Sequence, residues 1–165
     1  MSGLHIAPLR AGQFAQWLPL AQGYKTFYNT TVSDEGYAQA WQDLLGGEPL
    51  LGLGAWKAAG TEAIDTEDAA PAGPLLGIAH AVFHASTWAP RVCYLQDLFV
   101  APQARGQGVG EALIAHLAQQ AQARGASRLY WLTHETNATA RRLYDRVAAH
   151  HGFIRYDHRM APPPP

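Results

Sequence analysis

One stretch constrains this chain more than any other: a strand, three glycines at alternate positions and a helix follow one another within residues 92–121. Residues 92–100 are rich in β-branched, aromatic and aliphatic side chains, which predicts a strand that Pro102 closes. A helix with one buried face is then predicted by apolar side chains at every fourth position, namely Val109, Leu113, Leu117 and Ala121. The glycines lie where the strand gives way to the helix, so this turn must allow a close approach or unusual backbone angles.

The segment from Arg105 to Glu111, called the glycine loop below, has the features of an anion site. Its glycines have no Cβ to keep a ligand away from the backbone, and the first amides of a helix have no partner within that helix. The positive end of the helix dipole and the charge of Arg105 both attract a phosphate. A plain turn is the alternative, because glycines commonly serve only to make turns.

Two nucleotide-binding patterns do not fit these glycines. A Walker A loop requires Lys and then Ser or Thr after its last glycine, whereas Glu111 follows Gly110 here. A dinucleotide fingerprint has different glycine spacing, occurs early in a βαβ unit and is followed ~20 positions later by an acidic residue, where this chain has Arg128. Both patterns are therefore excluded.

Composition narrows the class of protein further. With 165 residues, 48% of them hydrophobic and 15% charged, the chain is expected to form one globular domain with a substantial core. A net charge of −1 gives no electrostatic case for binding nucleic acid or an anionic membrane. Cys93 is the only cysteine, which excludes a disulfide framework, and no metal site is expected. No apolar run is long enough to span a membrane and no secretory leader is recognisable, so a cytoplasmic protein is predicted.

Apolar periodicity and chain breakers predict the remaining elements. Strands are expected over 4–9, 50–56, 75–83, 92–100, 128–133 and 153–160, and helices over 12–28, 34–45, 109–121 and 137–149. Ser33 is the expected N-cap of the second helix, and Pro19 is expected to bend the first helix or split off its first turn. Residues 58–74 are expected to form an exposed acidic loop, and residues 162–165 a proline-rich tail. The order β-α-α-β-β-β-α-β-α-β predicts an α/β fold in which helices cover a mixed sheet.

Several spaced motifs resemble the GCN5-related N-acetyltransferase (GNAT) family. The pyrophosphate loop of that family reads Arg/Gln-x-x-Gly-x-Gly/Ala, which Arg105, Gly108 and Gly110 match. A second match is the later signature Asn137…Ala140…Leu143-Tyr144…Gly152-Phe153. The strand sequence Leu-Gln-Asp-Leu-Phe-Val at 95–100 is similar to the Leu-Glu-Asp-Φ-Phe-Val strand (Φ, apolar) of the Hpa2-like and polyamine acetyltransferase branch. The resemblance covers nearly the whole chain. It implies a single domain over 1–161, with a mostly antiparallel central sheet flanked by helices.

The resemblance also implies acetyl-CoA as cofactor. Its pyrophosphate would bind beside Arg105 to the glycine-loop amides, those of Gly106, Gln107, Gly108, Val109, Gly110 and Glu111. Its pantetheine arm would pair with a splayed strand edge at Leu98, Phe99 and Val100. Asn137 would contact the arm as well, together with Ala140 and Tyr144 on the same helix. An N-cap is the alternative role for Asn137.

Acetyl transfer to an amine requires a deprotonated amine, a polarised carbonyl and a proton for the leaving thiolate. By resemblance, Tyr144 is the general acid and the backbone N–H of Leu98 polarises the carbonyl. A core tyrosine is the alternative for Tyr144, because apolar residues share its helical face. An alkyl amine has a pKa near ~10, so a base is needed, and Asp97 is the leading candidate. The alternative is a water chain or a relay through His80, His84 or His134.

The expected acceptor is the primary amine of a small molecule: a polyamine, an amino acid or a related amine. Gln96 stands where the branch has a carboxylate, which favours a monoamine or amino-acid-like acceptor over a polycation. The expected substrate-binding residues are Gln96, Asp97 and three aromatic residues suited to a cationic amine, namely Tyr24, Tyr28 and Trp88. A protein or peptide amine is the alternative acceptor, and a non-catalytic acyl-CoA-binding sensor is the alternative function. The resemblance further implies a homodimer formed through C-terminal elements, in which a partner could supply a strand beside 153–160.

Overall fold

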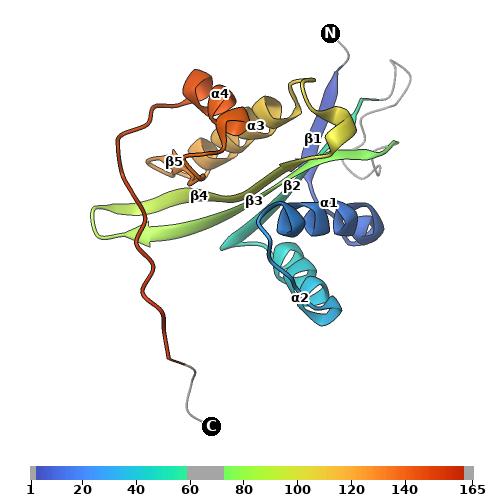
Figure 1. Ribbon diagram of the computed structural model, residues 1–165, viewed down its shortest axis with the longest axis horizontal. Coiled ribbons are helices and arrows are strands. Elements are labelled where there is room, and N and C mark those ends of the chain that lie inside the picture. Colours follow the sequence, from blue (N-terminus) through green and yellow to red (C-terminus); the bar gives the residue numbers. More distant parts are fainter. Residues whose placement is uncertain (1–2, 59–72, 162–165) are drawn as a thin grey trace. The chain divides into compact units, whose positions relative to one another are not determined.

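The computed structural model describes residues 3–58 and 73–161, and it divides the chain into two units, 1–132 and 133–165. The larger unit holds the sheet and three α-helices, and the smaller unit holds the last helix (Figure 1). The elements in chain order are β1 (Leu4–Pro8), η1 (Ala11–Gln13), α1 (Phe14–Phe27), α2 (Asp34–Leu45), β2 (Leu50–Lys57), β3 (Leu75–Ser86), β4 (Ala89–Val100), η2 (Pro102–Ala104), α3 (Val109–Ala123), β5 (Leu129–Tyr130) and α4 (Ala138–Val147).

The larger unit is built on a five-stranded sheet with the strand order β1-β2-β3-β4-β5. The first four strands are antiparallel neighbours, and β5 lies parallel to β4. The parallel pairing is short, with Cys93 opposite Leu129 and Tyr94 opposite Tyr130. The predicted mixed, mostly antiparallel sheet is therefore confirmed.

Helices α1 and α2 lie on one face of the sheet and α3 lies on the other (Figure 1). Alternate residues of β3 serve the two faces: Ala79, Ala81 and Phe83 are buried, while His80, Val82 and His84 point the other way and are half-buried. On the α1 face, Trp17 packs against Trp41 of α2, with 5.1 Å between the ring centroids. This aromatic core fixes α1 against the sheet.

Two local features were predicted for the front helices: a cap at Ser33 and an effect of Pro19 on the first helix. The Ser33 side chain caps α2 by accepting a hydrogen bond from the Gly36 amide at 3.2 Å. Helix α1 continues through Pro19, and the turn before it, η1, is a 3₁₀ turn.

Among the described residues, no helix is both long enough and apolar enough to cross a membrane.

Three strand predictions need correction. The strand β3 runs on to Ser86, so the hairpin turn is shorter than the sequence predicted. The strand β5 is only two residues long, although 128–133 was expected to be extended. The final strand expected over 153–160 is not formed: residues 148–161 have no regular structure. A strand requires a neighbour to pair with, and no such neighbour accompanies this segment in the described part of the smaller unit.

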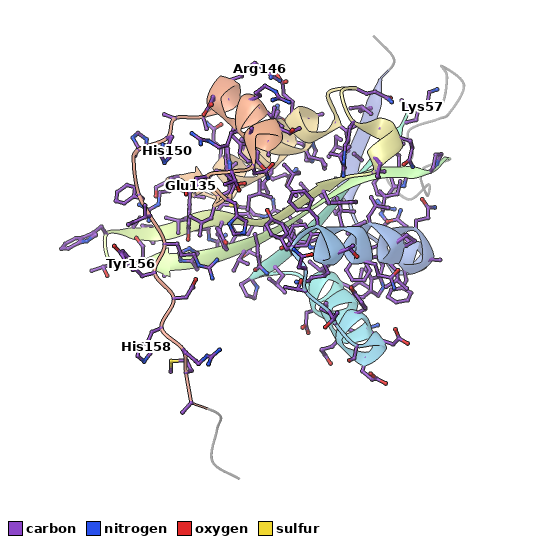
Figure 2. All side chains as sticks on the ribbon, in the orientation of Figure 1. Lys57, Glu135, Arg146, His150, Tyr156 and His158 are labelled. Carbon is purple, nitrogen blue, oxygen red and sulfur yellow. The ribbon has the colours of Figure 1, made fainter. Side chains whose placement is uncertain are left out.

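The C-terminal segment instead exposes apolar side chains. Phe153 is 84% exposed and Tyr156 is 85% exposed, and Ile154 and Met160 are exposed as well. Figure 2 shows Tyr156 and His158 projecting from an extended chain. The acidic loop predicted over 58–74 lies, except for its ends, outside the described residues, as does the tail predicted at 162–165. The single domain expected over 1–161 stays a prediction.

Candidate active site

A bulge in β4 determines where Asp97 points. Leu95 lies opposite Ala81 and Asp97 lies opposite His80, so Gln96 is an extra residue without a partner on β3. Residues two apart in a regular strand share a face, but the bulge sends Leu95 into the buried core and Asp97 to the α1 face. The carboxylate therefore meets His80, which the alternation of β3 places on that same face.

Three side chains from three elements are joined by hydrogen bonds at this point. The Nδ1 of His80 lies 2.9 Å from Oδ2 of Asp97, and both side chains are 12% exposed. The indole N–H of Trp17 donates to Nε2 of His80 at 2.9 Å, and Trp17 is 1% exposed. We call these three residues, together with Tyr24 of α1, whose hydroxyl interacts with the Asp97 carboxyl, the Asp97 cluster.

Electrostatics keep the Asp97 carboxyl ionised. Burial raises its pKa, but the hydrogen bond from His80, the hydroxyl of Tyr24 and the charge of Lys25 outweigh burial and hold the pKa below its ordinary value. Burial and the negative charge of Asp97 raise the pKa of Tyr24, so that its hydroxyl remains a donor. Lys25 also lies over the Tyr24 ring, with Nζ 5.6 Å from the centroid. A carboxylate and an ammonium thus lie near the same phenol ring.

The glycine loop has the backbone shape that its sequence suggested. Gly106 has a φ of 74° and Gly108 a φ of 79°, angles that L side chains rarely adopt. A Cβ added at either position would meet nothing within 4 Å, so the space above both glycines is open. Gly108 is the N-cap of α3, and the first amides of a helix have no carbonyl of their own helix to bind. The geometry suits an anion with several acceptor oxygens.

The strand end between the cluster and the loop has one open edge. Leu98, Phe99 and Val100 pair with β3 on one side, and on the other side β5 reaches no further than Tyr94 within the described residues. The Phe99 ring packs where Gly23 leaves room, because a Cβ at Gly23 would lie 2.7 Å from that ring. The Arg105 guanidinium lies 5.8 Å from the Phe99 centroid, and its Nε donates to the Val100 carbonyl at 3.3 Å. Arg105 is thereby anchored at the start of the glycine loop.

In the smaller unit, α4 carries the remaining predicted residues. Asn137 is its N-cap: Oδ1 accepts from the Ala140 amide at 3.3 Å, and Nδ2 donates to Thr133 at 3.2 Å. Asn137 is therefore an N-cap, and its contact with the cofactor arm stays a prediction. Tyr144 is half-buried on the same helix, and its carbonyl accepts from the Ala148 amide at 2.8 Å.

Not every predicted substrate residue lies at the cluster. Tyr28 packs against Tyr24 with its ring tilted by 56° and the ring centroids 5.0 Å apart. Trp88 lies at the tip of the β3–β4 hairpin and is 94% exposed. About nine residues of strand separate it from Asp97, roughly 30 Å at ~3.3 Å per residue, so Trp88 cannot line a pocket there. The pairing of His80 with Asp97 was missed because it depends on a bulge of one residue, and the contact of Trp17 with His80 was missed because the two residues are 63 positions apart.

Comparison with known proteins gives matches over most of the chain. The model of the acetyltransferase (GNAT) family matches residues 17–149. The D-amino-acid N-acetyltransferase HPA3 of Saccharomyces cerevisiae is 32% identical over 133 residues, which cover 80% of this chain and 76% of that protein. The thialysine N-epsilon-acetyltransferase of Bos taurus is 38% identical over 80 residues, covering 48% of this chain and 47% of the bovine protein.

Solved structures share the fold. The aminoglycoside acetyltransferase AAC(6')-Iy, in complex with a bisubstrate analogue, superposes with a TM-score of 0.76 at 17% identity, covering 97% of this chain and all of that one. The ribosomal-protein-alanine N-acetyltransferase of Brucella melitensis gives a TM-score of 0.70 at 24% identity, covering 96% and 99% of the two chains. At these identities the likeness establishes the architecture alone.

Proposed function

The chain belongs to the acetyltransferase (GNAT) family and is an acetyl-CoA-dependent N-acetyltransferase, and from that premise we propose that its acceptor is the primary amine of an amino acid or a closely related small molecule. The observation that carries the proposal is the ionised, nearly buried carboxylate of Asp97 beside Tyr24 and Lys25. Gln96, next in the chain, is neutral and exposed, so the strand offers one carboxylate where a polycation would require more. The yeast relative acts on D-amino acids by its name, which agrees with this acceptor class.

The charges near Tyr24 suit a zwitterion. A cationic ammonium group would bind Asp97 and gain a charge-assisted hydrogen bond, while a carboxylate on the same molecule would be attracted to Lys25. The faces of Tyr24 and Tyr28 add a favourable surface for the cation. A lowered pKa makes Asp97 a weaker base than an ordinary aspartate. We therefore assign Asp97 to binding and orienting the amine, and assign removal of the proton to water.

The cofactor has a matching place on the chain. The open, positive-φ glycines and the first amides of α3 fit a pyrophosphate, with the Arg105 charge beside them. The unpaired edge of β4 at Leu98, Phe99 and Val100 fits the amides of a pantetheine arm. Acetyl-CoA supplies an activated acetyl group as a thioester. We assign the backbone N–H of Leu98 to hydrogen-bond the carbonyl oxygen and the Tyr144 hydroxyl to protonate the departing sulfur.

A thiol-release screen tests the acceptor class. Each amino acid is compared with the amine that lacks its carboxylate: D- and L-lysine with cadaverine, and D- and L-alanine with ethylamine, alongside spermidine, thialysine and an aminoglycoside. The proposal expects higher kcat/KM for the carboxylate-bearing member of each pair, and loss of that preference in Lys25→Gln. Faster turnover of spermidine or of the decarboxylated amines would contradict it. Cys93 adds little background, because burial raises the pKa of its thiol to about 11.

We also propose that two copies associate through residues 153–160. Phe153, Ile154, Tyr156 and Met160 form an apolar segment that is exposed in the single chain, and an extended segment can gain backbone partners from a second copy. Light scattering or sedimentation should give a dimer mass for the wild type and a monomer mass for a Phe153→Ser, Ile154→Ser variant. A monomeric wild type would contradict the proposal.

A further inference from the structure

The hydrogen bonds of His80 determine which ring nitrogen carries its hydrogen. An indole N–H can only donate, so Nε2, which lies 2.9 Å from Nε1 of Trp17, must accept with its lone pair. A carboxylate can only accept, so Nδ1, which lies 2.9 Å from Oδ2 of Asp97, must carry the hydrogen. The partners on both sides thus select the neutral Nδ1–H tautomer.

Burial makes this choice strict. Trp17 is 1% exposed, and the side chains of His80 and Asp97 are each 12% exposed, so water offers little competition for any of these bonds. The Trp17 ring also packs on the His80 ring, with centroids 5.9 Å apart, and it is held in turn by Trp41. The imidazole therefore has a fixed orientation as well as a fixed tautomer.

A fixed Nδ1–H tautomer leaves His80 no means of moving protons. Nε2 has its only lone pair engaged by Trp17, and Nδ1 already carries a hydrogen. A base or relay needs a nitrogen that can take up a proton and pass it on, and neither ring nitrogen can do so while both bonds are kept. His80 instead donates to the Asp97 carboxylate and holds it in one orientation, as hydrogen-bonded neighbours of functional groups commonly do.

We infer that His80, its ring fixed by Trp17, is a positioning residue that holds Oδ2 of Asp97 and leaves the other carboxylate oxygen to bind the amine. The inference rests on the proposed function for the identity of the bound group, but the tautomer does not depend on it. Tyr24 and Lys25 of α1 also act on the carboxylate. Amine binding thereby depends on His80 and Trp17, although neither residue contacts the amine.

Nitrogen-15 NMR of the protein tests the tautomer without any substrate. The expected spectrum at pH 7 assigns a protonated Nδ1 and an unprotonated Nε2 to His80, identified by the loss of its signals in His80→Asn. A protonated Nε2 on His80 would overturn the inference. Because no acceptor is added, this result stands apart from success or failure of the acetylation screen.

Kinetics of two substitutions separate positioning from proton relay. The Asn amide in His80→Asn places an N–H near the position of Nδ1, whereas His80→Ala places none there. With the fastest amine of the screen, His80→Ala should lose about tenfold or more in kcat/KM for the amine, and His80→Asn should stay within about threefold of the wild type. The KM for acetyl-CoA should stay unchanged in both.

The matched control is His84→Asn on the same strand. His84 lies outside the cluster, with Nδ1 2.8 Å from the Ala85 carbonyl and Nε2 2.9 Å from the Tyr130 hydroxyl, and its substitution should leave the amine kinetics unchanged. Equal losses in His80→Asn and His80→Ala, carried by kcat rather than by KM, would assign His80 to proton transfer and overturn the inference. If His80→Ala does not fold, His80→Gln takes its place in the comparison with His80→Asn. The longer Gln side chain carries its amide past the Nδ1 position. We therefore expect a larger loss of kcat/KM for the amine in His80→Gln than in His80→Asn.

Discussion

The glycine loop and the Asp97 cluster lie at successive points along β4 and its continuation, yet they are built in opposite ways. The loop is one contiguous segment, open to solvent, and its shape depends on glycines at positive φ. The cluster draws on α1, β3 and β4, and its central side chains are nearly buried. Because the two regions share few supports, acetyl-CoA binding should depend on the loop and amine binding on the cluster. Damage to one should leave the other intact.

The largest effect is expected outside both regions, at Tyr144. Tyr144→Phe removes the hydroxyl assigned to protonate the leaving sulfur and should lower kcat roughly 100-fold, since general acid catalysis contributes on the order of 10²-fold or more. Both KM values should change less than about twofold, because neither binding region is altered. The control is Tyr156→Phe, an exposed tyrosine of the same unit. Undiminished turnover in Tyr144→Phe would contradict the assignment of Tyr144 as the general acid.

The next largest effect is expected from Asp97→Asn. Replacing the ionised carboxylate removes a charge-assisted hydrogen bond to the amine and should lower kcat/KM for the amine by roughly 30- to 100-fold. The KM for acetyl-CoA should not change. Asp43→Asn is the control, because Asp43 pairs with Gln39 on the surface of α2. A parallel rise in the KM for acetyl-CoA would mean that the two regions are not separate.

Gly108→Ala should have the opposite pattern to Asp97→Asn: it should weaken binding of acetyl-CoA and spare binding of the amine. A side chain at a φ of 79° costs about 1–2 kcal/mol of strain, and relieving it would shift the first amides of α3. The KM for acetyl-CoA should rise about tenfold while the KM for the amine stays constant. Gly125→Ala is a matched control at the other end of α3, with a φ of 73° and open space around it. It should lose similar stability without a change in cofactor binding.

The pH dependence of stability should distinguish the cluster from the loop. A carboxyl whose pKa is lower in the folded state stabilises the fold above its unfolded value of about 3.9, and this contribution is lost as pH falls through the folded value. The difference in unfolding free energy between wild type and Asp97→Asn should therefore stay constant from pH 6 to about pH 5 and shrink as the pH falls below about 4. Urea titrations measure it, and the difference for Gly108→Ala should stay constant over the same range. A constant difference for Asp97→Asn would contradict a lowered pKa.

The smallest effect is expected at Gly23, where α1 approaches the strand that joins the two regions. An added Cβ would lie 2.7 Å from the Phe99 ring, which must move by a fraction of an ångström. Because only the far edge of one ring has to move, Gly23→Ala should lower the free energy of unfolding by about 1 kcal/mol. Each KM should change less than about threefold. Thermal unfolding and steady-state kinetics check this. A larger change in both KM values would make Phe99 a link between the loop and the cluster.

These two regions also differ in how far the sequence predicts them. The loop follows from neighbours in the chain: a strand, alternate glycines and a periodic helix, and Gly108 becomes the helix N-cap. Ser33 and Asn137 are likewise local caps, and both form. The front helices and the first four strands follow from apolar periodicity in the same way, whereas the order of the strands in the sheet does not.

The cluster could not be predicted, because its geometry depends on a single unpaired residue. Without the bulge at Gln96, strand alternation would place Asp97 on the same face as Leu95, away from His80. Trp17 is 63 positions from His80, so no local pattern relates them. The strand expected over 153–160 failed for a related reason, since an extended segment becomes a strand only when a neighbour pairs with it.

Calorimetric titration with acetyl-CoA tests the division of function most directly. It is applied to the wild type, Asp97→Asn and Gly108→Ala, each first checked for folding by thermal unfolding. We predict that Asp97→Asn binds acetyl-CoA within about twofold of the wild-type Kd although it acetylates poorly, and that Gly108→Ala binds about tenfold more weakly. Equal weakening in both variants, or unchanged binding in Gly108→Ala, would contradict the assignment of the cofactor to the glycine loop and of the amine to the Asp97 cluster.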